Sequence, residues 1–221
     1  MNNIDESWIE ILLNWADKNA IPDLEWIEHD SYLKGGYFRG LPRDTEKLLN
    51  LTTLNLLGSQ LTELPTEICN LTNLNSLYLL GNQLTELPMR IDQLIHLEEL
   101  YLAGNCLSEL PKQIGSLKNL KLLLLQENQI KTLPKELGNL LSLTTLELGS
   151  NQLTSLPKEI GKLTSLTKLT LCKNRLTKLP LEIENLLNLR EIDFVYNRLK
   201  FEKEHIAWLE GLMAQDCEVS I

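Results

Sequence analysis

The chain has 221 residues, with 21 Lys and Arg against 30 Asp and Glu and a formal net charge of −9, and only 5% of its residues are aromatic. This length is typical of one domain with small appendages. An acidic chain without a basic stripe is a poor partner for nucleic-acid phosphates or anionic lipid, so we expect neither nucleic acid nor membrane as a partner.

The N-terminal sequence MNNIDESWIEILLNWADKN carries acidic residues where a secretory signal peptide needs Lys or Arg. No apolar stretch approaches the roughly 20 residues of a transmembrane helix. The four cysteines are widely spaced and form no CxxC motif. Together these features predict a cytoplasmic protein with free thiols, and they leave export without a signal peptide open.

Residues 1–50 are predicted to form an N-terminal helical cap that ends in a degenerate half repeat, GLPRDTEKLLN. Asn3 and Glu6 have the spacing of a capping box at the start of the helix. The apolar residues that then fall on one helical face are Trp8, Ile9, Leu12, Leu13, Trp15 and Ala16.

Four further large apolar residues follow this helix: Trp26, Ile27, Tyr37 and Phe38. Two interpretations are open for them. They could form an aromatic cluster that binds a ligand, or they could cover the end of an apolar core, which needs large apolar side chains. We favour the second interpretation, in which the aromatic residues belong to the cap.

Residues 51–197 repeat with a period of 23. The units open with Leu51, Leu74, Leu97, Leu120, Leu143, Leu166 and Leu189. Their shared frame is LxxLxLxxNxLxxLPxxIxxLxx. The leucines at positions 4 and 6 alternate as one face of a strand requires, while the apolar residues of the second half have helical spacing. Each proline is expected just inside the short helix, and Gly115, Gly138 and Gly161 are expected to end it.

This frame resembles the leucine-rich repeat family in its 23-residue form with an LP-containing second half. It is similar to small stand-alone bacterial leucine-rich repeat proteins and to intracellular Ras-binding scaffolds. The resemblance implies an α/β solenoid, curved like a horseshoe, with helical caps at both ends. A concave parallel sheet of about seven strands would line one side, and short helices or 3₁₀ turns would form the convex side.

An asparagine follows each predicted strand except the first, where Ser59 takes its place. These asparagines are Asn82, Asn105, Asn128, Asn151, Asn174 and Asn197. An amide in a sharp turn can bond the backbone groups that the turn leaves unpaired. We therefore expect a structural ladder from them and no catalytic role.

Residues 198–221 are predicted to form the C-terminal cap. An amphipathic helix over 201–214 would bury Ile206, Trp208, Leu209 and Leu212, and a short strand, CEVSI, would follow it.

Positions 3, 5 and 7 of the units face the concave surface if positions 4 and 6 face the core. In the first four units these columns are rich in apolar side chains, and charged or polar groups surround them. The predicted partner-binding residues are Tyr78, Tyr101, Leu122, Leu124, Leu80 and Leu57, with Glu99, Gln126 and Glu147 at the rim. The alternative is that these side chains are good strand formers that only pack on their column neighbours.

The sequence contains no pattern that predicts catalysis, a metal site or a cofactor. His29, His96 and His205 lie far apart along the solenoid, and metal-ligand spacing is missing. The predicted function is a non-enzymatic monomeric module that binds a protein or peptide on its concave face, as a scaffold or regulator in signalling. The alternative function is an exported bacterial effector that uses the same face on a host protein.

Overall fold

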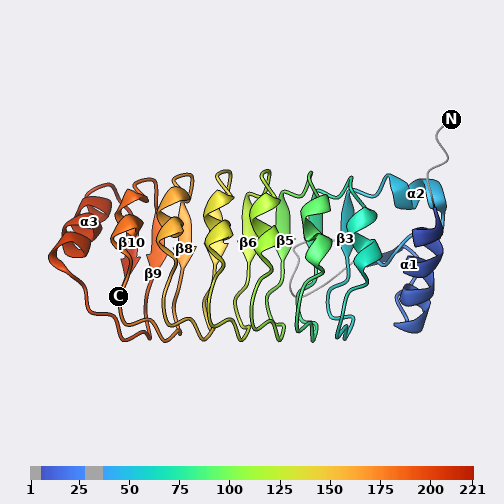
Figure 1. Ribbon diagram of the computed structural model, residues 1–221, viewed down its shortest axis with the longest axis horizontal. Coiled ribbons are helices and arrows are strands. Elements are labelled where there is room, and N and C mark those ends of the chain that lie inside the picture. The colour runs from blue at the N-terminus through green and yellow to red at the C-terminus, as the bar shows by residue number, and fades with distance from the viewer. Residues whose placement is uncertain (1–5, 28–36) are drawn as a thin grey trace.

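The computed structural model describes residues 6–27 and 37–221. The repeats form a row, with a parallel sheet along one face, short helical turns along the other, and an α-helical cap at each end (Figure 1). This is the solenoid that the sequence predicts. Asn3 and His29 lie outside the described residues.

One strand of each repeat and one strand of the C-terminal cap form a parallel sheet. The strands are β3 (Thr53–Asn55), β4 (Ser76–Tyr78), β5 (Glu99–Tyr101), β6 (Leu122–Leu124), β7 (Thr145–Glu147), β8 (Lys168–Thr170), β9 (Glu191–Asp193) and β10 (Glu218–Ser220). The sheet has eight strands rather than about seven, because β10 of the cap pairs with β9 in parallel.

The strand register places the expected leucines in the core. In β6 the side chain of Leu123 is fully buried, as are those of Leu120 and Leu125 on either side of the strand. Leu123 pairs with Leu100 of β5, in line with the 23-residue period. Leucines of one column therefore stack from repeat to repeat and form one continuous core.

The second half of six repeats forms a 3₁₀ turn rather than an α-helix. These turns are η1 (Thr66–Asn70), η2 (Met89–Gln93), η3 (Lys112–Ser116), η4 (Lys135–Asn139), η5 (Lys158–Lys162) and η6 (Leu181–Asn185). Each proline of the LP motif lies one residue before its turn in extended or near-extended backbone, as Pro134 does with φ −67° and ψ 143°, and not inside the turn as predicted.

The role predicted for three of the glycines is wrong. Gly115, Gly138 and Gly161 lie inside their 3₁₀ turns and do not end them. A Cβ atom at Gly138 would clash with the backbone carbonyl of Glu159 in the next repeat. Glycine is needed there because consecutive turns pack closely, and not because the backbone must adopt a left-handed conformation.

The asparagines form a ladder between consecutive repeats. Asn128 shows the pattern: its Nδ2 donates to the carbonyls of Leu102 at 2.9 Å and Leu125 at 3.1 Å, and its Oδ1 accepts from the amide of Leu107 at 2.9 Å. The other asparagines of this column, Asn82, Asn105, Asn151, Asn174 and Asn197, repeat these contacts. The ladder joins each turn to the repeat before it.

The N-terminal cap begins with helix α1 (Ser7–Lys18), which packs on η1 and buries Ile9, Leu12 and Ala16. Glu6 is the residue before the helix and makes no side-chain capping bond, so the expected role for it inside the first turn is wrong. The degenerate half repeat contains a short helix, α2 (Thr45–Leu49), whose N-cap Asp44 accepts from the amide of Lys47.

The C-terminal cap consists of helix α3 (Lys203–Met213) and strand β10. Trp208, Leu209 and Leu212 are buried as expected, but Ile206 is exposed. His205 is buried in its place, and its Nδ1 accepts a hydrogen bond from the backbone amide of Glu202 at 3.3 Å. The imidazole thus closes the first turn of the helix, which fixes the face that α3 presents to the core.

Candidate functional site

The solvent side of the sheet is the candidate site. Tyr78, Tyr101, Leu122 and Leu124 all lie on this side, on the three consecutive strands β4, β5 and β6. Each of them is half-buried, because side chains in one column lie one strand spacing apart, about 4.8 Å, and cover one another.

Tyr78 and Tyr101 form a stacked pair in the centre of this surface. Their ring centroids are 4.2 Å apart and the planes differ by 11°. The hydroxyl of Tyr101 donates to Oε2 of Glu99 at 3.1 Å, and the hydroxyl of Ser76 donates to the same oxygen at 3.0 Å. Burial and then the neighbouring Tyr78 raise the pKa of Tyr101 far above its ordinary value, so this hydroxyl remains a donor.

The C-terminal half of the sheet is charged rather than apolar. Lys168 lies between Glu147 and Glu191, and its Nζ is 3.1 Å from a carboxylate oxygen of each. Burial lowers the pKa of Lys168, but the hydrogen bonds to Glu191 and Glu147 outweigh it and raise the pKa overall. Glu147 is therefore already paired with a cation of the same sheet.

Leu57, Leu80 and Gln126 line a shallow groove of about 530 Å³ that follows the turns after β3 to β6. Its floor contains the three glycines of position 8, which lack side chains where later repeats carry Glu, Ser, Lys and Tyr. The complete lining is Tyr37, Arg39, Leu57, Gly58, Leu80, Gly81, Ala103, Gly104, Gln126 and Glu127. The groove borders the tyrosine pair on the carboxyl side of the strands.

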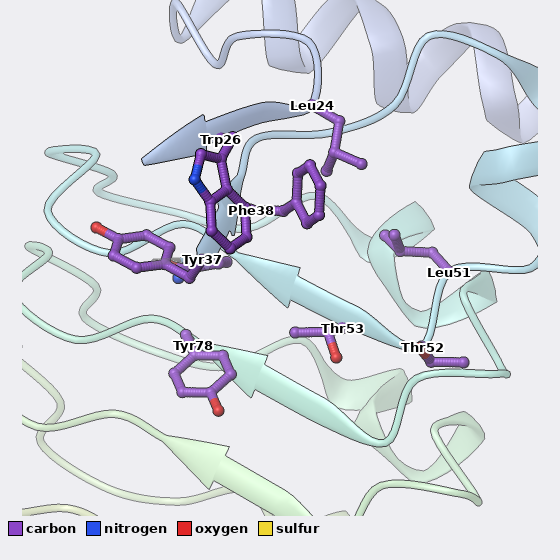
Figure 2. A pocket seen from close by; sticks show the side chains of 9 residues that line it. Leu24, Trp26, Tyr37, Phe38, Leu51, Thr52, Thr53 and Tyr78 are labelled. Carbon is purple, nitrogen blue, oxygen red and sulfur yellow. The ribbon is translucent and has the colours of Figure 1, made fainter. Parts of the chain in front are cut away.

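A second hollow, the aromatic pocket, is lined by Trp26, Tyr37 and Phe38, for which an aromatic ligand site was the less favoured of two interpretations of the sequence. It has a volume of about 440 Å³ and lies between the sheet and a two-stranded antiparallel pair, β1 (Glu25–Ile27) and β2 (Tyr37–Arg39). Its lining is Leu24, Trp26, Tyr37, Phe38, Leu51, Thr52, Thr53, Asn55 and Tyr78. Figure 2 shows the aromatic side chains of the pair gathered over β3, with Tyr78 on the other side.

The interpretation of Trp26 and Phe38 as a cover for the core is wrong. Each is 54% exposed, and their rings meet edge to face with centroids 5.0 Å apart. Trp8 and Trp15 of α1, by contrast, do pack against the core. One sequence feature distinguishes the packed tryptophans from the exposed one. Trp8 and Trp15 lie on the same face of a predicted helix, whereas Trp26 lies outside that helix.

Backbone contacts hold the pair β1–β2 beside the sheet. The amide of Gly40 donates to the carbonyl of Asn55 at 3.1 Å, which joins the end of β2 to β3. Gly40 has φ +105°, and a Cβ atom there would clash with the carbonyl of Pro22. Oδ1 of Asp23 accepts from the amides of Leu24 at 2.7 Å and Arg43 at 3.1 Å, and these bonds lower the pKa of Asp23. The pair β1–β2 is therefore held at the residues just before β1 and just after β2.

Three other properties of residues 6–27 and 37–221 bear on function: metal binding, a membrane span and cysteine reactivity. Within these ranges no group of three or more His, Cys, Asp or Glu could hold a metal ion, and no helix is long and apolar enough to cross a membrane. The four cysteines are free thiols, and burial raises the pKa of Cys69 to about 12, which suppresses its reactivity.

The class of protein that this fold defines is a repeat solenoid with an open sheet surface. A family model described as a leucine-rich repeat region matches residues 105–214. The chain belongs to the leucine-rich repeat family. Proteins of this family are typically protein-interaction modules. No curated protein matches the chain in sequence.

Three solved structures illustrate the similarity. A leucine-rich repeat protein of Leptospira interrogans is 35% identical with a TM-score of 0.55, over 76% of this chain and 55% of that one. The ectodomain of the Arabidopsis thaliana membrane receptor kinase GASSHO1/SCHENGEN3, in complex with Casparian strip integrity factor 2, is 31% identical with a TM-score of 0.66, over 71% of this chain and 20% of that one.

An internalin of Listeria monocytogenes is 23% identical with a TM-score of 0.63, over 81% of this chain and 51% of that one, and shares the fold. The chain thus spans about half or less of the length of these proteins.

Proposed function

We propose that this protein is a non-enzymatic module that binds a protein or peptide partner on the concave face of its sheet. The observation that carries the proposal is the stacked pair Tyr78–Tyr101, which continues into Leu124 and Leu122 on the next strand. Such a cluster has the composition of an interface core, in which tyrosine is one of the enriched residue types. The rim is polar, as Glu99 and Gln126 show.

The rigidity of the surface supports this function. Each strand is joined to its neighbours by backbone hydrogen bonds, and the asparagine ladder fixes the turns next to it. A partner that docks on a preformed surface loses less affinity to conformational ordering. A similar leucine-rich repeat ectodomain, 31% identical over most of this chain, was solved in complex with a partner.

A finer version of the proposal is that the module acts in the cytoplasm, as a monomer, to scaffold or regulate a signalling protein. Four unpaired cysteines are in keeping with a reducing compartment. The identity of the partner is best approached by photo-crosslinking from a reactive amino acid at Leu124, with the same group at Lys135 on the convex side as the control.

The partner that crosslinks at Leu124 then serves for a quantitative test. We expect Tyr101→Ala to weaken its binding by about tenfold or more, equivalent to at least 1.4 kcal/mol, because Tyr101 is central in the cluster. Titration calorimetry with wild type, Tyr101→Ala and Lys135→Ala measures this. Unchanged affinity of Tyr101→Ala together with a loss for Lys135→Ala would place the interface on the convex side.

A further inference from the structure

The aromatic pocket is suited to an apolar group. None of its nine lining residues is charged, and Leu24, Leu51, Trp26, Phe38 and Tyr78 supply most of its walls. The nearest cation of β2, Arg39, belongs to the neighbouring groove, and its guanidinium lies 3.4 Å from the hydroxyl of Ser59. A charged group in this pocket would lose hydration without a counter-charge, whereas an apolar side chain would gain from burial against aromatic rings.

Glu99 is suited to a cation. Among the described residues it has no basic side chain within ion-pair distance, in contrast to Glu147 and Glu191, which share Lys168. Its Oε2 accepts hydrogen bonds from the hydroxyls of Ser76 at 3.0 Å and Tyr101 at 3.1 Å, so two donors hold the carboxylate in place. Its other oxygen, Oε1, accepts no hydrogen bond from the described residues. This atom is also not a buried atom that lacks a partner, so it is accessible to a cation.

Tyr78 links the two features. Tyr78 lines the aromatic pocket, and its ring also stacks on Tyr101, whose hydroxyl donates to Glu99 of β5. The strands β3 and β5 are two spacings apart, which is roughly 10 Å. An extended chain advances about 3.3 Å per residue, so a separation of three residues covers this distance. At a separation of two residues the backbone covers about 6.6 Å, and the long side chain of Arg or Lys reaches the rest.

We propose that the concave face binds an extended segment of a partner protein with a large apolar side chain and an Arg or Lys two or three residues away. The apolar side chain enters the aromatic pocket, and the basic side chain pairs with Glu99. The net charge of −9 also favours a basic segment during association. This inference rests on the proposed function and adds the chemistry of the partner to it.

The test is a selection of random linear peptides displayed on phage against the full chain. We expect sequences that combine Trp, Phe or Leu with Arg or Lys at a separation of two or three residues. A synthetic peptide of the consensus sequence is then titrated by calorimetry against wild type and variants. In Glu99→Gln the preference for a basic residue should disappear, and affinity should lose most of its dependence on salt.

Two variants test the pocket. Phe38→Ala removes one wall, and Thr53→Lys places a charge at the floor without removing an aromatic ring; each should weaken binding of the consensus peptide about tenfold or more. Both positions are exposed, so the thermal midpoint should change little. Glu109→Gln, an exposed carboxylate outside the concave columns, is the matched control for Glu99→Gln and should bind as wild type.

The outcomes separate this inference from the proposed function. Selected peptides that lack the apolar and basic pair, but whose binding still requires Tyr101, would overturn the inference and leave the concave interface intact. The same holds if Phe38→Ala and Thr53→Lys bind the consensus peptide normally. Peptides or partners whose binding does not depend on Tyr101 would overturn both.

Discussion

At the scale of single residues, neighbouring leucines of one strand have different roles. In β6 Leu123 is fully buried in the core, whereas Leu122 and Leu124 are half-buried on the concave face. The same side chain therefore lies in the core at one position and is partly exposed to solvent at the next. The alternation of a strand is the physical cause.

This difference predicts the stability of two matched variants. Leu123→Ala should lower the free energy of unfolding by about 2–5 kcal/mol, because it leaves a cavity in the core. Leu124→Ala should lower it by at most about 1 kcal/mol, because the surrounding side chains and water can fill the space. Urea denaturation of both variants measures these values. Equal losses would contradict the register.

The raised pKa of Tyr101 predicts a dependence of stability on alkaline pH. The protonated phenol is favoured in the folded state, so its contribution is complete below the ordinary tyrosine pKa of about 10 and is lost as pH rises above it. The free energy of unfolding should therefore fall less steeply above pH 10 in Tyr101→Phe than in wild type. Lys168 adds a fall of the same sign in both proteins, so the difference between them reports Tyr101. Parallel curves would argue against a buried Tyr101 hydroxyl.

At the scale of elements, the glycines of η3, η4 and η5 permit consecutive 3₁₀ turns to pack closely. Gly138 lies where a Cβ atom would clash with the backbone of Glu159, while Gly211 of α3 has open space around it. The two glycines therefore differ in their tolerance of a methyl group.

A pair of glycine variants tests this contrast. Gly138→Ala should destabilise the protein by about 1–3 kcal/mol, because adjacent repeats must move apart. Gly211→Ala should stabilise it by about 0.5–1 kcal/mol through the higher helix propensity of alanine. Thermal unfolding followed by circular dichroism measures both signs, and a neutral Gly138→Ala would mean that the turns pack less closely.

At the scale of the whole molecule, the contacts between elements run from each repeat to the next, and the caps contact the end turns η1 and η6. Stability in such a solenoid is close to a sum over repeats and their interfaces. One repeat should therefore be removable without loss of the fold, provided that the 23-residue frame is kept.

Deletion of residues 143–165, which form one complete unit, should give a protein that still unfolds cooperatively, with β6 now beside β8. The deletion should also leave the tyrosine pair and the aromatic pocket unchanged, so binding of the partner should persist. The shorter deletion of 143–164 breaks the frame by one residue and should prevent correct stacking. Urea denaturation compares the two, and similar curves would contradict the frame.

The sequence by itself determined the solenoid, the strand register and the columns of the concave face, because a 23-residue period and the alternation of strands are local rules that repeat in every unit. The tertiary structure alone decided where Trp26 and Phe38 lie and which carboxylates of the sheet lack a cation. The position of Trp26 and Phe38 depends on contacts outside the repeats, such as Gly40 with Asn55, which no periodic pattern encodes. The period makes Lys168 and Glu191 neighbours, but the ion pairs of Lys168 with Glu147 and Glu191 depend on side-chain conformation, which the period does not fix.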